Sequence, residues 1–253
     1  MDLGLEGLKA VVTGGSRGIG RAIVDGLAAE GCAVALCARG AEGVDATVQA
    51  VRAGGGKAIG EAVDVSEGAA LQTWVASAAE ALGGVDILVC NASALAAKSG
   101  DAAWLAGFET DIMGTVRAVD TALPWLKSSP SGAIVIIAST AALEIYAGLR
   151  PYNSIKAALV NYTAGLSVDL GGHGVRANSV CPGATYFDGG TWQRAERDNP
   201  DMFAYMRDLS VLGRMAAPEE IARAVIFLAS PAASFMTGAN VVVDGGLTNR
   251  VQY

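Results

Sequence analysis

Short runs of apolar residues alternate with segments of helical periodicity along the whole chain. Continuous apolar runs bounded by turns predict buried strands, and apolar residues at every third or fourth position predict helices. On this basis strands are expected at residues 8–13, 33–38, 57–63, 85–90, 133–138, 175–180 and 240–243. Helices are expected at residues 18–30, 44–53, 67–82, 102–126, 152–170 and 218–229.

This alternation predicts the class of fold. Strands that are apolar along their length and separated by helices are typical of a parallel sheet covered on both faces. Right-handed crossovers then give a doubly wound, Rossmann-like α/β domain with a mostly parallel, seven-stranded sheet. No linker or repeat interrupts the pattern, so residues 1–253 are expected to form one domain. Residues 183–217 form the one long irregular interval, which in a compact domain is often a functional lid.

Composition restricts the class of protein further. Hydrophobic residues make up 52% and charged residues 17%, which excludes a disordered chain of low hydrophobicity and high charge. The net charge of −7 argues against general binding to nucleic acid. The four cysteines show no C-x-x-C spacing and there is one histidine, so buried thiols and no metal site are expected. With no signal-like or membrane-spanning stretch, we expect a cytoplasmic protein without a membrane partner.

A glycine-rich turn joins the first predicted strand to the first predicted helix. It reads Thr13-Gly14-Gly15-Ser16-Arg17-Gly18-Ile19-Gly20. Glycines let the backbone approach a diphosphate closely, and the helix N-terminus supplies free N–H groups and partial positive charge. The turn is therefore expected to hold the diphosphate of a dinucleotide, and the alternative is a tight turn without a ligand.

The spacing of these glycines resembles that of the short-chain dehydrogenase/reductase family, and further motifs match the family in order. They are Asp64-Val65, Asn91-Ala92, Ser139, Tyr152 with Lys156, Cys181-Pro182-Gly183 and Asp244-Gly245-Gly246. The resemblance covers nearly the whole chain, and it is strongest to the compact branch that includes 3-oxoacyl-[acyl-carrier-protein] reductases. It implies a nicotinamide-dependent oxidoreductase acting on a small carbonyl or alcohol substrate, and a homotetramer or homodimer.

Roles for individual residues follow from the same resemblance. Ser139 would bind the substrate oxygen, Tyr152 would act as acid or base, and Lys156 would also bind the nicotinamide ribose. The residues expected to bind the cofactor are Gly14, Ser16, Arg17, Gly18, Ile19, Gly20, Arg39, Asp64, Val65, Asn91, Ala92, Tyr152, Lys156, Pro182, Gly183 and Thr185.

The chemistry of the tyrosine and the lysine can be argued from their spacing. Tyr152 and Lys156 are four residues apart in a predicted helix, so they share one face. A free tyrosine has a pKa of about 10, and a neighbouring ammonium and a cationic nicotinamide ring both favour the phenolate. The pair is therefore suited to proton transfer during hydride transfer. Ser139 ends the most β-branched strand, and its alternative role is a strand-end cap.

Two positions depart from the family pattern. Asp111 stands where the family usually has Asn, and Ser93 stands where it usually has Gly. In the family the backbone carbonyl of the first position holds a water that leads to the lysine. Asp111 is expected in the catalytic set, where its side chain would add a negative charge near Lys156 or be protonated if desolvated. The alternative is a solvated acid on a helix surface.

The end of the second predicted strand bears on the identity of the nicotinamide cofactor. NAD enzymes of such folds place an acid there to hold the ribose 2′-hydroxyl. Residues 33–40 contain no Asp or Glu, whereas Arg39 lies in that segment and Arg17 lies in the glycine turn. Guanidinium groups pair with phosphate through a planar fork, so NADP is expected and NAD is the alternative. Each arginine has the further alternative of a solvated charge.

Aromatic residues and methionines concentrate within residues 186–206. In the family the segment after the Pro-Gly motif covers the substrate, so this composition favours an apolar or acyl-chain ketone. The alternative is a subunit interface or ordinary helix packing. The residues expected to meet the substrate are Leu143, Glu144, Tyr146, Tyr186, Phe187 and Trp192.

A second class of function competes with an enzyme. The departures at Asp111 and Ser93 would suit a catalytically weak nicotinamide-binding sensor or scaffold. The complete set of Ser139, Tyr152 and Lys156 argues for an enzyme.

Overall fold

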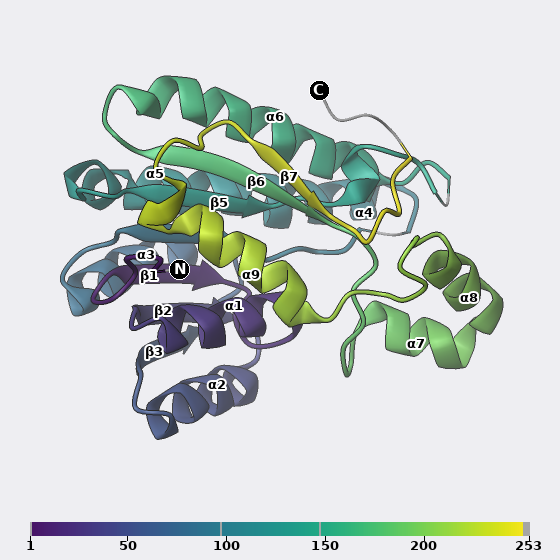
Figure 1. Cartoon of the computed structure of the whole chain (residues 1–253), viewed down its shortest axis with the longest axis horizontal. Helices are drawn as coiled ribbons and strands as arrows, with labels where there is room; N and C mark the ends of the chain where they lie inside the picture. Colours follow the sequence, from purple (N-terminus) through teal and green to yellow (C-terminus); the bar gives the residue numbers. More distant parts are fainter. Residues whose placement is uncertain (1, 97, 147, 250–253) are drawn as a thin grey trace.

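A computed structural model gives the fold and describes residues 2–96, 98–146 and 148–249. Seven strands form one sheet in the order β3-β2-β1-β4-β5-β6-β7, and every neighbouring pair is parallel (Figure 1). The strands are β1 (Lys9–Thr13), β2 (Ala33–Ala38), β3 (Lys57–Ala62), β4 (Ile87–Cys90), β5 (Ala133–Ile137), β6 (Arg176–Pro182) and β7 (Asn240–Val243). The predicted doubly wound α/β fold is confirmed. Residues 1 and 250–253, at the ends of the predicted domain, lie outside the described residues.

Helices cover both faces of the sheet, and each face carries its own buried apolar cluster. On one face lie α1 (Gly18–Ala29), α2 (Ala41–Ala53) and α9 (Pro218–Ala229). On the other face lie α3 (Gly68–Leu82), α5 (Gly114–Ser128) and α6 (Pro151–Gly171). Because both faces are covered, the central strands are buried along their length, which explains their uninterrupted apolar sequence.

The order of the strands determines where a ligand can enter. The chain leaves β1 toward β2 on one side, and β4 returns to the other side of β1. In the pairing of β1 with β4, Thr13 lies opposite Cys90 at the carboxyl ends of the two strands. The loops after these strands diverge there, and such a switch point is where open α/β sheets form a crevice.

The prediction of one continuous helix at residues 102–126 is wrong. The structure has α4 (Asp101–Gly107), a π-helical segment (Phe108–Met113) and α5. The wider π turn adds a residue to the helical path and re-aims the side chains within it, and such turns are frequent at functional sites. Apolar periodicity alone could not reveal it, because it assumes a regular helix, and the segment carries a polar residue, Asp111, that is only 1% exposed.

The prediction that residues 183–217 are irregular is also wrong. They contain α7 (Thr191–Asp198) and α8 (Pro200–Asp208), which project beyond the carboxyl edge of the sheet (Figure 1). The side chain of Asn199 caps α8 by accepting a hydrogen bond from the N–H of Met202 at 3.2 Å, and Pro200 follows at the first helical position. Asn followed by Pro is a recognisable helix start, although both helices are short.

The cysteines belong to the packed interior. All four are free and buried, as predicted. Burial raises the pKa of the thiols of Cys32, Cys37 and Cys90 to about 12, so they remain protonated at neutral pH. Within the described ranges, no group of three or more His, Cys, Asp or Glu side chains could hold a metal ion. In the same part of the chain, no helix has the length and apolar character needed to cross a membrane.

The start of α1 tolerates only glycine at residue 20. A Cβ on Gly20 would collide with the carbonyl oxygen of Gly14 and with the side-chain amide of Asn91. We expect Gly20→Ala to lower the free energy of unfolding by about 1–3 kcal/mol through overpacking. Urea unfolding of the cofactor-free protein measures this change.

The matched control is Gly165→Ala in α6, where nothing lies within 4 Å of the added carbon. That substitution removes the conformational entropy cost of a helical glycine and should raise the free energy of unfolding by about 0.5–1 kcal/mol. Equal effects at the two positions would contradict the steric explanation.

Candidate active site

A cleft of about 1020 Å³ runs along the carboxyl edge of the sheet at the switch point between β1 and β4. It extends from the glycine turn after β1 to Ser139 and Tyr152. Every residue predicted to bind the cofactor lines it except Gly18. Residues far apart in the sequence are thus brought into one continuous surface of the size of a ligand site.

The glycine turn has the form of an anion cradle. Gly14 and Gly18 have φ angles of +68° and +53°, a region that side chains rarely adopt. Arg17 occupies the N-cap of α1, and no side chain caps the first N–H groups of the helix. Free N–H groups at a helix N-terminus attract phosphate, so the turn fits the diphosphate of a dinucleotide.

The turn is held in place by Asn91 at the end of β4. The Asn91 side-chain amide donates to the carbonyl oxygens of Gly14 at 2.9 Å and Thr13 at 3.2 Å. Its backbone N–H donates to the Thr13 hydroxyl at 3.1 Å. Asn91 therefore fastens the loop after β4 to the loop after β1, so its side chain shapes the cradle from behind.

At one end of the cleft lie an exposed arginine and a restrained carboxylate. Arg39 follows β2 and lines the cleft. Asp64 accepts hydrogen bonds from the Ser66 N–H at 3.0 Å and from the Ser66 hydroxyl at 2.7 Å. The backbone hydrogen bond from Ser66 holds the pKa of Asp64 below its ordinary value, and its hydroxyl and the positive charge of Arg39 act in the same direction.

The opposite end of the cleft contains a fully buried cation. Lys156 is 2% exposed, and its Nζ donates to the carbonyl oxygen of Ile137 at 2.9 Å. The same Nζ lies 3.0 Å from Oδ1 of Asp111 and 5.8 Å from the centroid of the Tyr152 ring. Burial alone disfavours the ammonium, but the Asp111 carboxylate and Tyr152 more than offset this and raise the pKa of Lys156.

Asp111 is an interior residue that joins two parts of the site. Its Oδ1 pairs with Lys156, and its Oδ2 accepts a hydrogen bond from the N–H of Ala94 at 2.8 Å. The alternative of a solvated helix acid is therefore wrong. The side chain of Asp111 reaches the lysine directly, so both carboxylate oxygens are engaged in the interior.

The structure fits both roles considered for Ser139, the group in the cleft and the cap at the end of its strand. It lines the cleft beside Tyr152, and its Oγ accepts a hydrogen bond from the N–H of Ala141 at 3.1 Å at the start of a short turn. A hydroxyl that accepts one hydrogen bond keeps its own proton for donation. The cap thus orients the hydroxyl without consuming its capacity as a donor.

The residues predicted to meet the substrate are separated by the structure. Trp192 and Phe187 line the cleft, and the Phe187 ring packs against Gly18, so Phe187 lies at the phosphate end. Leu143, Glu144, Tyr146 and Tyr186 do not line it. Tyr146 and Tyr186 pack against a small apolar cluster formed by Met206, Met215 and Leu247. Much of the aromatic segment is therefore ordinary helix packing, the alternative considered above.

Sequence reasoning missed part of the apolar wall of the cleft. Leu95, Leu105 and Ala106 line it and come from the loop after β4 and from α4. Leu95 and Leu105 are 44% and 65% exposed, which is unusual for leucine. The available signal was a run of small and apolar residues directly after Asn91, in a loop where polar residues are the rule.

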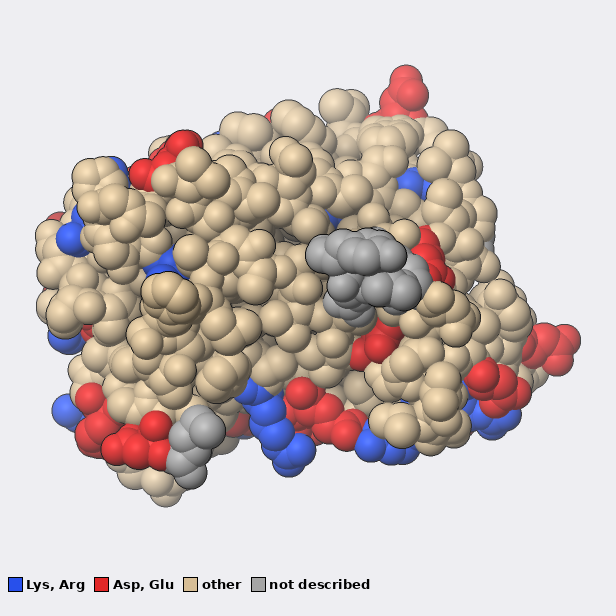
Figure 2. Space-filling model, turned by 45° about the horizontal axis from the view of Figure 1, so that its top comes forward, with Lys and Arg blue, Asp and Glu red and all other residues tan. Residues whose placement is uncertain are grey.

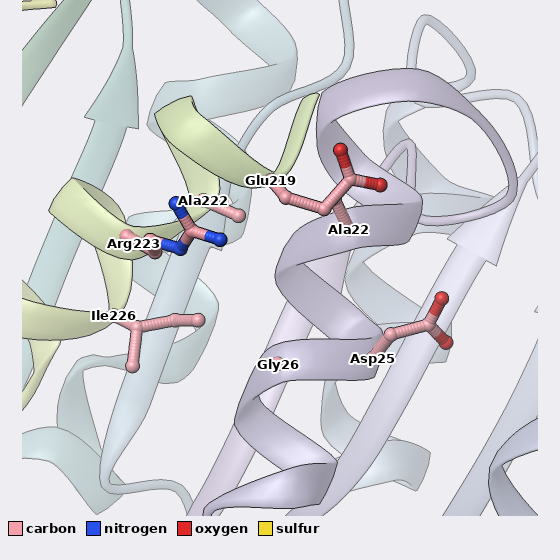
Figure 3. A pocket seen from close by; sticks show the side chains of 7 residues that line it. All are labelled: Ala22, Asp25, Gly26, Glu219, Ala222, Arg223 and Ile226. Carbon is pink, nitrogen blue, oxygen red and sulfur yellow. The ribbon is translucent and has the colours of Figure 1, made fainter. Parts of the chain in front are cut away.

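A smaller hollow of about 350 Å³ lies between α1 and α9 (Figure 3). Its lining includes Asp25, Glu219 and Arg223, and none of its lining residues is shared with the cleft. On the face shown in Figure 2, acidic and basic side chains of the described residues are interspersed among uncharged surface. None of the residues predicted for the cofactor or for catalysis lines this second hollow.

Comparisons with known proteins agree with this geometry. The family model described as enoyl-(acyl carrier protein) reductase matches residues 14–248. Isoepoxydon dehydrogenase patN of Penicillium expansum is 35% identical over 100% of this chain and 99% of its own length. Meso-2,3-butanediol dehydrogenase of Serratia marcescens is 38% identical over 94% of this chain and 93% of its own length. L-sorbose reductase of Gluconobacter frateurii, solved with NADPH and L-sorbose, is 30% identical over 99% of this chain and 100% of its own, with a TM-score of 0.92.

These relatives are dehydrogenases and reductases that match the chain along nearly its whole length. The chain is an oxidoreductase that belongs to the short-chain dehydrogenase/reductase family.

Proposed function

We propose that the chain is an NADP-dependent oxidoreductase that interconverts a carbonyl compound and a secondary alcohol, with a substrate that is apolar or acyl-chain-like. The observation that carries the proposal is the buried ammonium of Lys156, 5.8 Å from the ring of Tyr152, at the end of a cleft that begins at an anion cradle. The nicotinamide, when bound, supplies or accepts the hydride.

In the reductive direction, the Tyr152 hydroxyl donates its proton to the carbonyl oxygen of the substrate, and Ser139 donates a hydrogen bond to the same oxygen. The ammonium of Lys156 stabilises the phenolate that is left behind. In the oxidative direction, the phenolate accepts the proton of the alcohol. Lys156 is held for this purpose by the carbonyl of Ile137 and by Asp111.

Asp111 acts in this scheme as a positioning residue for Lys156. Its carboxylate keeps the lysine charged within the interior, where a lone ammonium would tend to lose its proton. The positive charge of Lys156 interacts with both this carboxylate and Tyr152. Asp111 thus secures the charge of Lys156 and limits how strongly it favours the phenolate.

The preference for NADP rests on Arg39 and Arg17. Both arginines are exposed and line the cleft, Arg39 after β2 and Arg17 within the glycine turn. A 2′-phosphate between them would gain charge-assisted hydrogen bonds. The relative solved with NADPH supports this preference, and NAD is the alternative.

The substrate class and the lid are supported by the apolar wall. Trp192 comes from the proposed lid at residues 183–217, while Leu95 comes from the loop after β4 and Leu105 from α4. An apolar enclosure around a few polar groups favours a ketone with an alkyl or acyl chain.

A cytoplasmic homotetramer or homodimer is part of the same proposal. Free, buried cysteines are typical of proteins in a reducing compartment. Val168 on α6 and Phe235 after α9 are 80% and 104% exposed, and apolar residues at such positions are suited to contacts between subunits. A catalytically weak sensor or scaffold remains the alternative, and catalytic turnover separates the two.

Tyr152→Phe removes the hydroxyl proposed to move the proton and leaves the ring in place. We expect kcat to fall at least about 100-fold, which is the lower range for general acid–base catalysis, with little change in the affinity for NADPH. Oxidation of NADPH by a panel of ketones gives kcat, and fluorescence titration gives the affinity. Tyr162→Phe, on the same helix and outside the cleft, should keep wild-type activity. A Tyr152→Phe variant with a third of wild-type turnover would refute the role.

Arg39→Asp should shift the cofactor preference from NADPH toward NADH. It removes a charge-assisted contact worth about 1.5–3 kcal/mol and adds repulsion, so the ratio of kcat/KM for NADPH over NADH should fall roughly tenfold or more. The control is Arg223→Asp, which changes the net charge equally but lies in the hollow between α1 and α9 (Figure 3). If the wild type prefers NADH, or if both variants keep the wild-type ratio, Arg39 does not meet a 2′-phosphate.

Asp111→Asn keeps the shape of the side chain and removes its charge. The field of Lys156 would then act on Tyr152 alone, so the rise of the oxidation rate with pH should move to lower pH. Profiles of kcat/KM against pH for alcohol oxidation measure the shift. Asp120→Asn, an exposed acid on α5, should leave the profile unchanged. A profile that stays in place in Asp111→Asn counts against the proposed role, and a profile that moves to higher pH would show that Asp111 acts mainly by keeping Lys156 charged rather than by sharing its field.

A further inference from the structure

Leu95 has an unusual backbone. Among the described residues it is the one non-glycine residue with a positive φ, which is +50°. A leucine in this region carries conformational strain that persists only where the surrounding structure imposes it. Leu95 is 44% exposed, so burial of the leucine does not compensate for the strain.

Three hydrogen bonds hold the backbone of this loop. The N–H of Leu95 donates to the hydroxyl of Ser93 at 3.1 Å, and the N–H of Ala94 donates to Oδ2 of Asp111 at 2.8 Å. After Leu95, the carbonyl oxygen of Ala96 accepts a hydrogen bond from the N–H of Tyr152 at 3.3 Å. The loop is therefore fastened to both the π-helical segment and the first turn of α6.

Packing restrains the same loop from behind. Ala96 is buried, and a Cβ on Gly107 would come within 3.2 Å of the Ala96 methyl group and would also collide with Ile155. The glycine at 107 thus lets α4, α6 and the loop approach closely. With its backbone fastened on both sides, Leu95 cannot relax by moving the loop outward.

The side chain of Leu95 lies in the cleft. It lines the same surface as Ser139 and Tyr152, together with Leu105 and Ala106 from α4. A strained, exposed apolar residue beside the proposed proton donor has no evident structural purpose. Strain of this kind collects at ligand sites, where it fixes the position of a contact.

We propose that Leu95 determines substrate specificity by forming a rigid wall that limits the size of one substituent on the carbonyl carbon, and that Ser93 is a positioning residue for this wall. The substrate class that fits is a ketone, or the matching alcohol, with one small and one extended apolar substituent. This inference rests on the proposed function for its site, and it adds the residue and the chemical class that the site selects.

Two isomeric ketones test the proposal, 2-nonanone and 5-nonanone. They have the same composition and differ in whether the carbonyl carbon carries one small substituent or two butyl chains. We expect the wild type to favour 2-nonanone, and we expect Leu95→Ala to lower the ratio of kcat/KM for 2-nonanone over 5-nonanone roughly tenfold, since such steric differences in apolar pockets change selectivity by this order. The control is Leu212→Ala, an exposed leucine outside the cleft, which should keep the wild-type ratio.

A binding measurement separates failure of this proposal from failure of the proposed reaction. With NADP+ bound, neither ketone can be reduced, so quenching of the fluorescence of Trp192 and the other tryptophans reports the Kd of each ketone without turnover. The ratio of the two Kd values should shift in Leu95→Ala by the same factor as the kinetic ratio. If Tyr152→Phe retains turnover while the Kd ratio still shifts in Leu95→Ala, the proposed reaction scheme is wrong and the proposed role of Leu95 is supported. A Kd ratio in Leu95→Ala within twofold of wild type, or no binding of either ketone to either protein, would refute the proposed role of Leu95.

The backbone strain has its own test. Glycine adopts a positive φ without strain, so Leu95→Gly should melt at a higher temperature than Leu95→Ala, although both remove the leucine side chain. Ser93→Ala removes the acceptor for the N–H of Leu95 and should lower the 2-nonanone preference by a smaller factor than Leu95→Ala. A lower Tm for Leu95→Gly than for Leu95→Ala would show that the left-handed backbone is not imposed, and an unchanged preference in Ser93→Ala would remove Ser93 from the proposal.

Discussion

The buried ion pair between Lys156 and Asp111 is the interaction on which the chemistry of the cleft depends. An ammonium and a carboxylate that are both almost inaccessible to solvent lie 3.0 Å apart. Removing such charges from water costs roughly several kcal/mol per ion, so the pair persists because each charge has a further partner. Lys156 donates to the carbonyl of Ile137 at the end of β5, and Asp111 accepts from Ala94 in the loop after β4. One pair therefore connects α6, the end of β5, the loop after β4 and the π-helical segment around the end of the cleft.

The two ends of the cleft are built on different physical principles. At the phosphate end, glycines and uncapped N–H groups provide partial positive charge from the backbone, and Asn91 holds the turn without taking up those groups. At the chemical end, the charges belong to side chains that are locked by burial and hydrogen bonds. The first arrangement suits an anion such as a diphosphate, whose charge is spread over several oxygens. The second suits a proton transfer, which requires fixed distances.

The segment after β6 both packs into an apolar cluster of its own and lines part of the cleft, and its composition does not show which residues do which. Its aromatic residues and methionines mostly form a small apolar cluster of their own, with Met206, Met215 and Leu247 at its centre. This cluster stabilises α7 and α8 as a unit beyond the sheet, and only Phe187 and Trp192 of the predicted aromatics reach the cleft. Leu95 and Leu105, which come from outside this segment, therefore contribute to the apolar lining of the cleft alongside Phe187 and Trp192.

The sequence by itself determined the parallel sheet, the glycine cradle and the Tyr152–Lys156 pair, because each depends on local periodicity or on spacing within one element. The family resemblance placed Asp111 near Lys156, but periodicity left a solvated helix acid as an alternative, because a helical wheel assumes regular geometry and this residue lies in a π-helical segment. The sequence also could not identify Leu95, whose φ is positive and whose neighbours Ala94 and Ala96 are held by hydrogen bonds to Asp111 and Tyr152 from two other parts of the chain. Only the tertiary structure decided between the alternatives for Asp111 and revealed Leu95, because the contacts that fix these residues join segments that are distant in the sequence.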